Sequence, residues 1–152
     1  MHSYSSVAVG TDGTPRSMAA VRAAASLARV YGAKLTIICA HYSASGSVLN
    51  STNAELTGAN TITETESQEI LARAEAVAEK EQAGEVELIS RAGKPANVLI
   101  EAVAEIGADL LVVGNKGMHS LAGRVFGTVP GNVAVKARVD VMLVDTRAEA
   151  RS

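Results

Sequence analysis

The stretch LLVVGNKG, residues 110–117, decides the fold. Its four leading apolar residues are typical of a strand that is buried on both faces of a parallel sheet. Gly114 and Gly117 then indicate a tight turn, because glycine tolerates positive φ and permits close backbone approach. Further along, Gly127 and Thr128 precede a short helical pattern, which gives the spacing G-x-x-G-x(9)-G-T. The stretch therefore predicts a buried strand followed by a glycine-lined turn.

Outward from this stretch, short apolar runs alternate with segments of helical periodicity. The runs lie at about 6–9, 35–40, 86–89, 110–113 and 141–144, and the helical segments at about 15–31, 63–84, 95–107 and 129–138. This alternation favours an α/β fold, in which a parallel sheet carries helices on both faces. We expect one domain over residues 1–152, with its core at about 6–145.

Two segments are predicted to lie outside that core. Residues 43–60 are rich in Ser, Asn, Thr and Gly, and so predict a mobile surface loop that is either a tolerated insertion or a lid. The tail from about Arg147 is expected to be frayed.

Composition argues against several classes of protein. The formal net charge is −2, and the chain has three Tyr, one Phe and no Trp, so neither a basic surface nor stacking platforms for nucleic acid are expected. No run of about 18 apolar residues predicts a membrane span. The single cysteine, Cys39, suits a reducing compartment, and residues 1–6 do not resemble a secretion signal. We therefore expect a cytoplasmic protein that binds neither nucleic acid nor membrane.

A candidate anion site follows from the placement of the turns. Consecutive N–H groups of the turn at Gly114, and the helix start at Thr128 and Val129, are suited to phosphate. Gly10-Thr11-Asp12 follows the first strand and lies at the same sheet edge if the two strands are parallel neighbours. Asp12 then either accepts hydrogen bonds from ribose hydroxyls or forms an Asx turn at the helix entry; spacing alone does not separate these alternatives.

These residues resemble the signature of the universal stress protein family, in its ATP-binding branch. Gly114, Gly117, Gly127 and Thr128 match G-x-x-G-x(9)-G-[S/T], and Asp12 matches the acidic residue after the first strand. The likeness spans Ser6 to Val144, and residues 121–130 look most like actinobacterial members, among which cyclic nucleotide binding must be considered.

The resemblance implies an open five-stranded, Rossmann-like sheet ordered 3-2-1-4-5. It places adenine near Ala40 and Gly93, ribose at Asp12, and phosphates over the two glycine turns. It also brings Val129 and Asn132 near the phosphates. The remaining candidate nucleotide-binding residues are Gly10, Thr11, Asn115 and Lys116, and family members often carry other polar residues at the last two positions. Lys116 either neutralises a phosphate or is a solvated loop lysine.

The resemblance also implies a homodimer formed through the last strand, Val141 to Val144. An apolar strand at a sheet edge invites strand addition, which supports the same expectation on physical grounds. The alternative is an edge that the charges of Asp140 and Asp145 protect.

We therefore expect a nucleotide-binding stress protein, a sensor or sink for ATP, AMP or cyclic AMP, rather than an enzyme. Walker A, G-x-G-x-x-G and G-x-S-x-G motifs do not occur, and no convincing catalytic base or nucleophile is present. Mg²⁺ would accompany a bound triphosphate. One alternative is slow ATP hydrolysis or phosphotransfer, with Asp12 or Asp109 positioning a metal. Another is an interaction module that does not need nucleotide.

Overall fold

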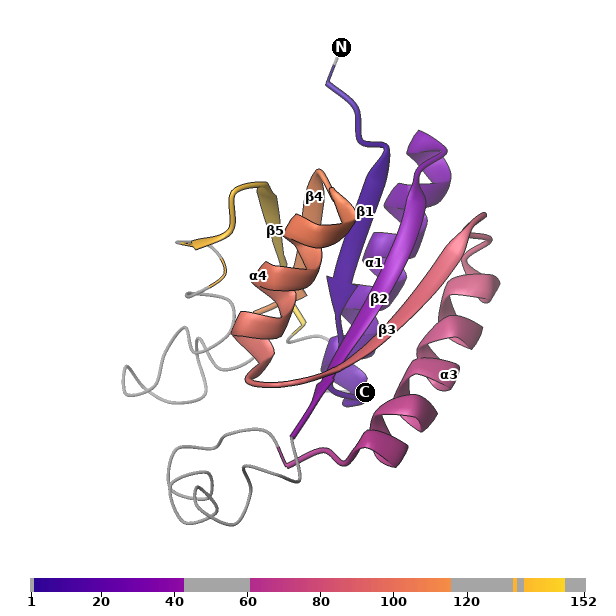
Figure 1. Ribbon diagram of the computed structural model, residues 1–152. Coiled ribbons are helices and arrows are strands. Elements are labelled where there is room, and N and C mark those ends of the chain that lie inside the picture. Colours follow the sequence, from indigo (N-terminus) through magenta and orange to yellow (C-terminus); the bar gives the residue numbers. More distant parts are fainter. Residues whose placement is uncertain (1, 43–60, 116–132, 134–135, 147–152) are drawn as a thin grey trace.

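The computed structural model describes residues 2–42, 61–115, 133 and 136–146 of the chain, and these form an open α/β sheet with helices (Figure 1). In chain order the elements are β1 (Ser6–Gly10), α1 (Pro15–Tyr31), β2 (Lys34–His41), α3 (Glu64–Lys80), β3 (Val86–Ala92), α4 (Pro95–Ile106), β4 (Leu110–Gly114) and β5 (Asp140–Val144). The sheet order is β3-β2-β1-β4-β5 and all four pairings are parallel. The predicted fold class and strand order are confirmed.

Helices cover the sheet on two faces, which gives two separate packing layers. Buried residues of α1 and α3 pack with alternate residues of the central strands, among them Val9, Ile37 and Val112. The other face is covered by α4, whose apolar side packs against Ala8, Ile38 and neighbouring residues. Strands buried on both sides favour apolar residues on both faces, which is why β4 is apolar throughout and the 35–40 stretch of β2 is apolar except at Thr36.

The helix ends follow their sequence signals. Thr14 caps α1 by accepting a hydrogen bond from the Ser17 amide, with Pro15 at the first helical position, and Gly32 ends the helix at φ 65°. Thr63 and Glu66 form the predicted capping box at the start of α3. These caps satisfy amides that the first turn of a helix leaves unpaired.

The structure differs from the sequence prediction at the ends of two elements. β3 continues three residues past the predicted end at Ile89, because the polar residues beyond it still pair with β2. Helix α3 ends at Lys80, before Gly84. Of the helix predicted at 129–138, Val133 and Lys136 are helical and the Ala137 amide bonds to the Val133 carbonyl; the rest lies outside the described residues, as do the 43–60 loop and the tail from 147.

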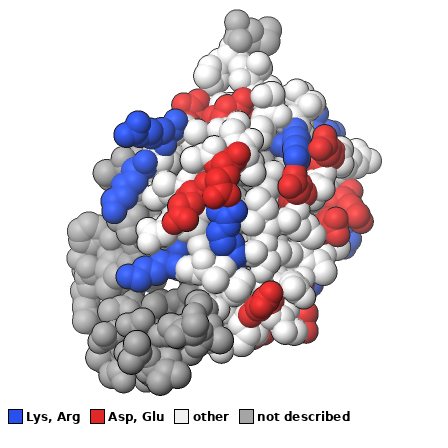
Figure 2. Space-filling model, viewed as in Figure 1, with Lys and Arg blue, Asp and Glu red and all other residues white. Residues whose placement is uncertain are grey.

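Charged side chains of both signs lie beside one another on the face that carries α4 (Figure 2). Arg91 of β3 and Glu105 of α4 form an ion pair of 2.6 Å there. Among the helices in the described ranges, none has the length and apolar character needed to cross a bilayer.

Candidate functional site

The direction of winding reverses between β1 and β4. The chain runs from β1 through β2 to β3 on one side of the sheet, then starts again on the other side with β4 and β5. Val9 pairs with Val112, so the carboxyl ends of β1 and β4, at Gly10 and Gly114, lie next to each other. Open α/β sheets bind ligands outside the carboxyl ends of the strands at such a reversal.

The loop after β1 is held in a fixed shape by its own hydroxyl groups. The Thr11 amide donates to the Ile38 carbonyl at 3.0 Å, which extends the pairing with β2 by one residue. The buried Thr11 hydroxyl lies 2.7 Å from the Ser17 hydroxyl and accepts a hydrogen bond from the Gly13 amide at 3.1 Å. The Thr11 side chain is therefore engaged within the turn that presents Asp12.

Asp12 is exposed, and its Oδ1 accepts hydrogen bonds from the Thr14 amide at 3.1 Å and the Thr14 hydroxyl at 2.7 Å. This is the Asx-turn geometry that the sequence left as one of two alternatives. The carboxylate lies near the end of β2: burial raises the pKa of the Cys39 thiol to about 11, and the negative charge of Asp12 adds to that rise. Asp12 thus places negative charge above the ends of β1 and β2.

Both glycines at the strand ends are sites of close packing. A Cβ on Gly10 would come within 2.8 Å of Leu99 Cδ2, and a Cβ on Gly114 within 3.1 Å of Thr146 Cγ2. Gly114 also lies beneath α1, where its Cβ would be 3.9 Å from the Arg16 carbonyl oxygen. A side chain at either position would have to displace these neighbours. Glycine therefore allows the neighbouring residues to pack closely against the ends of β1 and β4.

Asn115 faces the chain that leaves β5. Its Oδ1 accepts hydrogen bonds from the amide and the hydroxyl of Thr146, each at 3.1 Å. Thr146 is fully buried and was not singled out by the sequence analysis. No local pattern marks it, because its partner lies 31 residues away in the chain.

Two further predicted site residues meet at the ends of β2 and β3. Ala40 is buried on the α4 side of β2. Gly93 is exposed directly after β3, and its amide donates to the His41 carbonyl at 2.8 Å. The structure therefore brings Gly10, Thr11, Asp12, Ala40, Gly93, Gly114 and Asn115 to one edge of the sheet. The other predicted residues, Lys116, Gly117, Gly127, Thr128, Val129 and Asn132, lie outside the described residues.

Asp109 corrects one expectation. The hydrolase alternative named either Asp12 or Asp109 as the residue that positions a metal, but Asp109 lies at the amino end of β4, at the opposite edge of the sheet from Asp12. Its carboxylate accepts hydrogen bonds from the Ser5 amide, the Ser5 hydroxyl and the Ser6 amide, all at 3.0 Å. Asp109 is therefore a structural cap for the start of β1. Within the described residues no three His, Cys, Asp or Glu side chains cluster as metal ligands.

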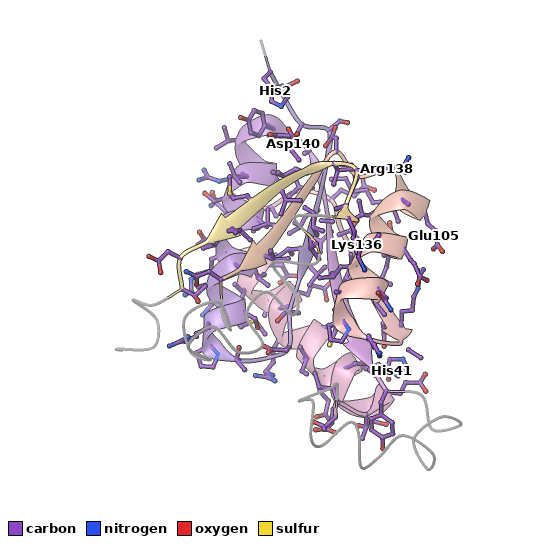
Figure 3. All side chains as sticks on the ribbon, turned by 90° about the vertical axis from the view of Figure 1, so that its left-hand side faces the viewer. His2, His41, Glu105, Lys136, Arg138 and Asp140 are labelled. Carbon is purple, nitrogen blue, oxygen red and sulfur yellow. The ribbon has the colours of Figure 1, made fainter. Side chains whose placement is uncertain are left out.

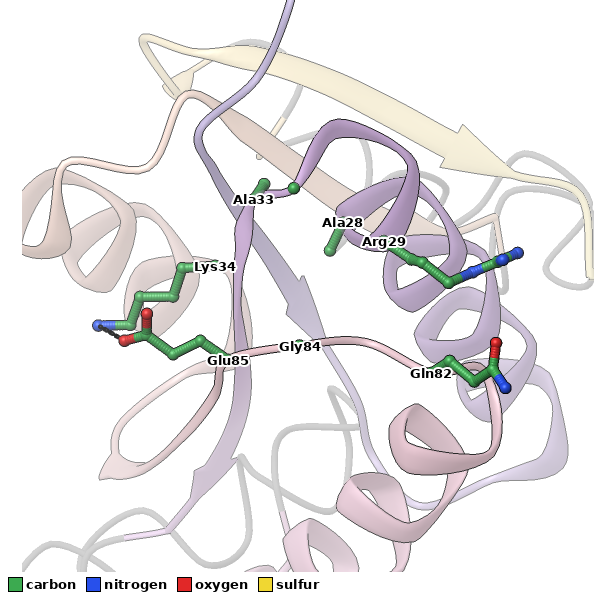
Figure 4. A pocket seen from close by; sticks show the side chains of 8 residues that line it. Ala28, Arg29, Ala33, Lys34, Gln82, Gly84 and Glu85 are labelled. Atoms are coloured by element: carbon green, nitrogen blue, oxygen red, sulfur yellow. Dashed lines mark ion pairs between the residues drawn. The ribbon is translucent and has the colours of Figure 1, made fainter.

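A pocket of about 250 Å³ also lies at the amino edge, away from Asp12 (Figure 4). Its walls come from the end of α1, the start of β2 and the segment before β3, with Arg29 and Gln82 on one side. On the other side Lys34 pairs with Glu85 at 3.8 Å. This pocket is not at the strand reversal.

The fold and the site together define an open, doubly wound α/β protein with an acidic loop after β1 and a glycine at the end of β4, at its switch point. The family model described as "Universal stress protein family" matches residues 3–145, and the chain belongs to this family. The predicted family is thus confirmed.

Individual relatives agree with this assignment. The chain is 39% identical over 151 residues to universal stress protein Rv1636 of Mycobacterium tuberculosis, with 96% of this chain and 99% of that protein covered. The crystal structure of Rv1636 is similar at 38% identity and a TM-score of 0.60, covering 96% of this chain and 98% of that one. A universal stress protein solved in complex with cAMP is similar at 34% identity and a TM-score of 0.77, covering 95% of this chain and 99% of that one.

Proposed function

We propose that this protein binds an adenine nucleotide at the carboxyl edge of β1 and β4. The observation that carries the proposal is the adjacency, at the strand reversal, of the Asp12 loop after β1 and Gly114 at the end of β4, where an exposed carboxylate lies near a residue that has no side chain. The similarity to a universal stress protein in complex with cAMP supports it.

Each residue at this edge has a role in the proposal. Asp12 accepts hydrogen bonds from ribose hydroxyls, for which its exposed carboxylate is suited. The backbone near Ala40 and Gly93 contacts adenine. The phosphates lie over the Gly114–Gly117 turn and the Gly127–Val129 segment, where main-chain amides and the Thr128 hydroxyl supply donors. A bound triphosphate brings Mg²⁺, which takes oxygen ligands from phosphates and one or two carboxylates. Asp12 is the carboxylate that this proposal assigns to the metal.

The protein acts as a sensor or sink rather than through turnover. We place it in the cytoplasm, where adenine nucleotides are available and the buried Cys39 thiol stays reduced.

In this proposal two copies pair through β5. Two large apolar side chains of this edge strand are exposed, Met142 at 37% and Leu143 at 41%. Unpaired edge strands with apolar side chains favour strand addition. Analytical ultracentrifugation tests this: Leu143→Lys is expected to shift the protein towards monomer, whereas Val30→Lys, at a 71% exposed position on α1, is not. A wild-type protein that is monomeric at all concentrations contradicts the dimer and leaves the nucleotide site standing.

Equilibrium dialysis with cAMP, AMP and ATP tests binding. We expect the wild type to retain at least one of them, and Asp12→Asn to weaken it by about tenfold, the effect of one hydrogen bond to a charged group. The amide of Asn still accepts from Thr14, so the turn is preserved. Glu79→Gln, which removes an exposed carboxylate near the end of α3, is the matched control.

The same samples separate binding from turnover. A binding protein returns intact nucleotide after prolonged incubation, whereas phosphate release that Asp12→Asn abolishes would favour the hydrolase alternative. Failure of all three nucleotides to bind at millimolar concentration would remove the proposal.

A further inference from the structure

The side chain of Asn115 is directed at the chain that follows β5. The Asn115 amide donates to the Val144 carbonyl at 3.0 Å. Oδ1 accepts from both the amide and the hydroxyl of Thr146 at 3.1 Å, and Nδ2 lies 3.4 Å from Asp145 Oδ1. Asn115, the first residue after β4, therefore bonds to three consecutive residues at the end of β5, namely Val144, Asp145 and Thr146. We call this set of hydrogen bonds the Asn115 clasp.

This clasp is packed as well as hydrogen bonded. Thr146 is 0% exposed, and its Cγ2 packs close to Gly114, 3.1 Å from where an added Cβ would lie. Loss of the Asn115 oxygen would leave the buried amide and hydroxyl of Thr146 without their acceptor, and this would lower the free energy of unfolding. The end of β5 and the residue that follows β4, Asn115, are thus expected to order or loosen together.

We infer that Asn115 is a positioning residue that couples occupancy of the site at the end of β4 to the order of β5. The inference rests on the proposed nucleotide binding and replaces the direct ligand contact that the sequence predicted for Asn115. A nucleotide that orders the Gly114–Asn115 backbone also stabilises the bonds from Asn115 to Val144 and Thr146. Because such coupling is reciprocal, weakening the clasp lowers nucleotide affinity, even from a residue that lies behind the site.

Two substitutions of one buried residue isolate the clasp. Thr146→Val keeps the shape and the methyl group of Thr146 but removes the hydroxyl bond to Asn115, whereas Thr146→Ser keeps the hydroxyl and removes the methyl. Asn115→Ala removes the acceptor altogether.

Two measurements follow these variants. Amide hydrogen exchange of residues 140–146, measured by NMR with and without cAMP, AMP or ATP at millimolar concentration, reports the order of β5. Calorimetric titration of the same variants reports nucleotide affinity.

We expect the bound nucleotide to slow exchange of the wild-type β5 amides by about tenfold, the effect of one to two hydrogen bonds. Thr146→Val and Asn115→Ala should lose most of this difference and bind nucleotide more weakly, and Thr146→Ser should retain both properties. Unchanged exchange at the β1 and β4 amides shows that a variant is folded.

The alternatives give different results. If wild-type protein binds nucleotide but β5 exchange is unaltered, the coupling is overturned and the proposed function stands. If Asn115→Ala weakens binding while Thr146→Val binds as the wild type does, Asn115 is a direct contact and the coupling is likewise overturned. If the wild type binds none of the three nucleotides, the proposed function fails and the coupling fails with it.

Discussion

The Tyr4 hydroxyl donates a hydrogen bond of 2.8 Å to Oδ2 of Asp140, the first residue of β5. His2 Nε2 lies 3.1 Å from the same oxygen, and the Tyr4 ring makes edge-to-face contacts with both His2 and Tyr31 of α1. Figure 3 shows His2 and Asp140 together at one end of the molecule and His41 at the other. The N-terminal segment is thereby joined to the edge strand.

The Tyr4–Asp140 contact predicts a shifted tyrosine ionisation. The hydrogen bond to Asp140, followed by burial and the Asp140 charge, raises the pKa of Tyr4 above 10.0. We expect Asp140→Asn to lower the pKa of Tyr4 towards that value. Phenolate absorbance measured from about pH 8 to about pH 12 follows the change, and Tyr4→Phe assigns the signal among the three tyrosines. Identical titration curves for wild type and Asp140→Asn would show that the bond does not form in solution.

The same contact has a pH-dependent effect on stability. A folded-state pKa above the unfolded value means that the stabilisation is fully present below about pH 10 and is lost as pH rises through the folded-state pKa. The stability difference between wild type and Tyr4→Phe is therefore expected to shrink at high pH, as measured by urea unfolding.

The stability that Asp109 contributes is expected to have the opposite pH dependence to that of Tyr4. Partial burial acts to raise the pKa of Asp109, but hydrogen bonds from the Ser5 and Ser6 amides and the Ser5 hydroxyl outweigh it and hold the pKa below 3.8. This stabilisation is present above about pH 4 and is lost as pH falls through the lowered pKa. Asp109→Asn should destabilise the protein by about 1 kcal/mol at pH 7, allowing for partial solvent screening.

Urea unfolding from about pH 6 to about pH 3 tests the Asp109 prediction. The gap between wild type and Asp109→Asn should close towards the acid end. Glu79→Gln, an exposed position, should show neither the loss nor the convergence. A gap that is constant with pH would contradict the assigned role of the carboxylate.

Thr36 predicts a stabilising substitution. Its hydroxyl is buried in β2 and has no hydrogen-bond partner among the described residues. Thr36→Val keeps the shape, removes the unsatisfied oxygen and should raise the free energy of unfolding by about 1 kcal/mol. Thr11→Val is the matched comparison, because the Thr11 hydroxyl bonds to Ser17 and Gly13, and it should lower stability by a similar amount. Equal effects of the two substitutions would contradict this account.

Gly114 and Thr146 predict a compensating pair. Gly114→Ala places a methyl 3.1 Å from Thr146 Cγ2 and should destabilise the protein by about 1–3 kcal/mol. Thr146→Ser removes that methyl group. The double variant should therefore lose less stability than the sum of the two single variants, by at least about 0.5 kcal/mol in a double-mutant cycle from urea unfolding. Simple additivity would show that the two groups are not in contact.

The sequence was sufficient to predict the fold where local signals and burial agree. The apolar run at 35–40 and the capping box at Thr63 each specify an element through short-range chemistry, and both are confirmed. The end of β3 was predicted too early because Ser90 and Arg91 are polar. β3 is an edge strand that pairs only with β2, so it can continue through polar residues that a central, fully buried strand would not contain.

The candidate site was predictable only in outline. Spacing placed Asp12 and Gly114 at one edge, but not the Thr14 bonds that orient Asp12 or the Thr146 bonds that occupy Asn115. Asp109 looked like a metal ligand because sequence shows an acidic residue beside a strand without showing at which end of the sheet it acts. Contacts between distant segments depend on the finished topology, and no local pattern specifies them.

The central position of β1 bears on how the nascent chain folds. β1 pairs on one side with β4, which is synthesised about a hundred residues later, and Tyr4 bonds to Asp140, 136 residues later. Contacts of such high sequence separation are slow to form, because the intervening loop must close first. Until β4 has been synthesised, β1 keeps one apolar edge unpaired, so the nascent chain is most prone to aggregate before β4 becomes available.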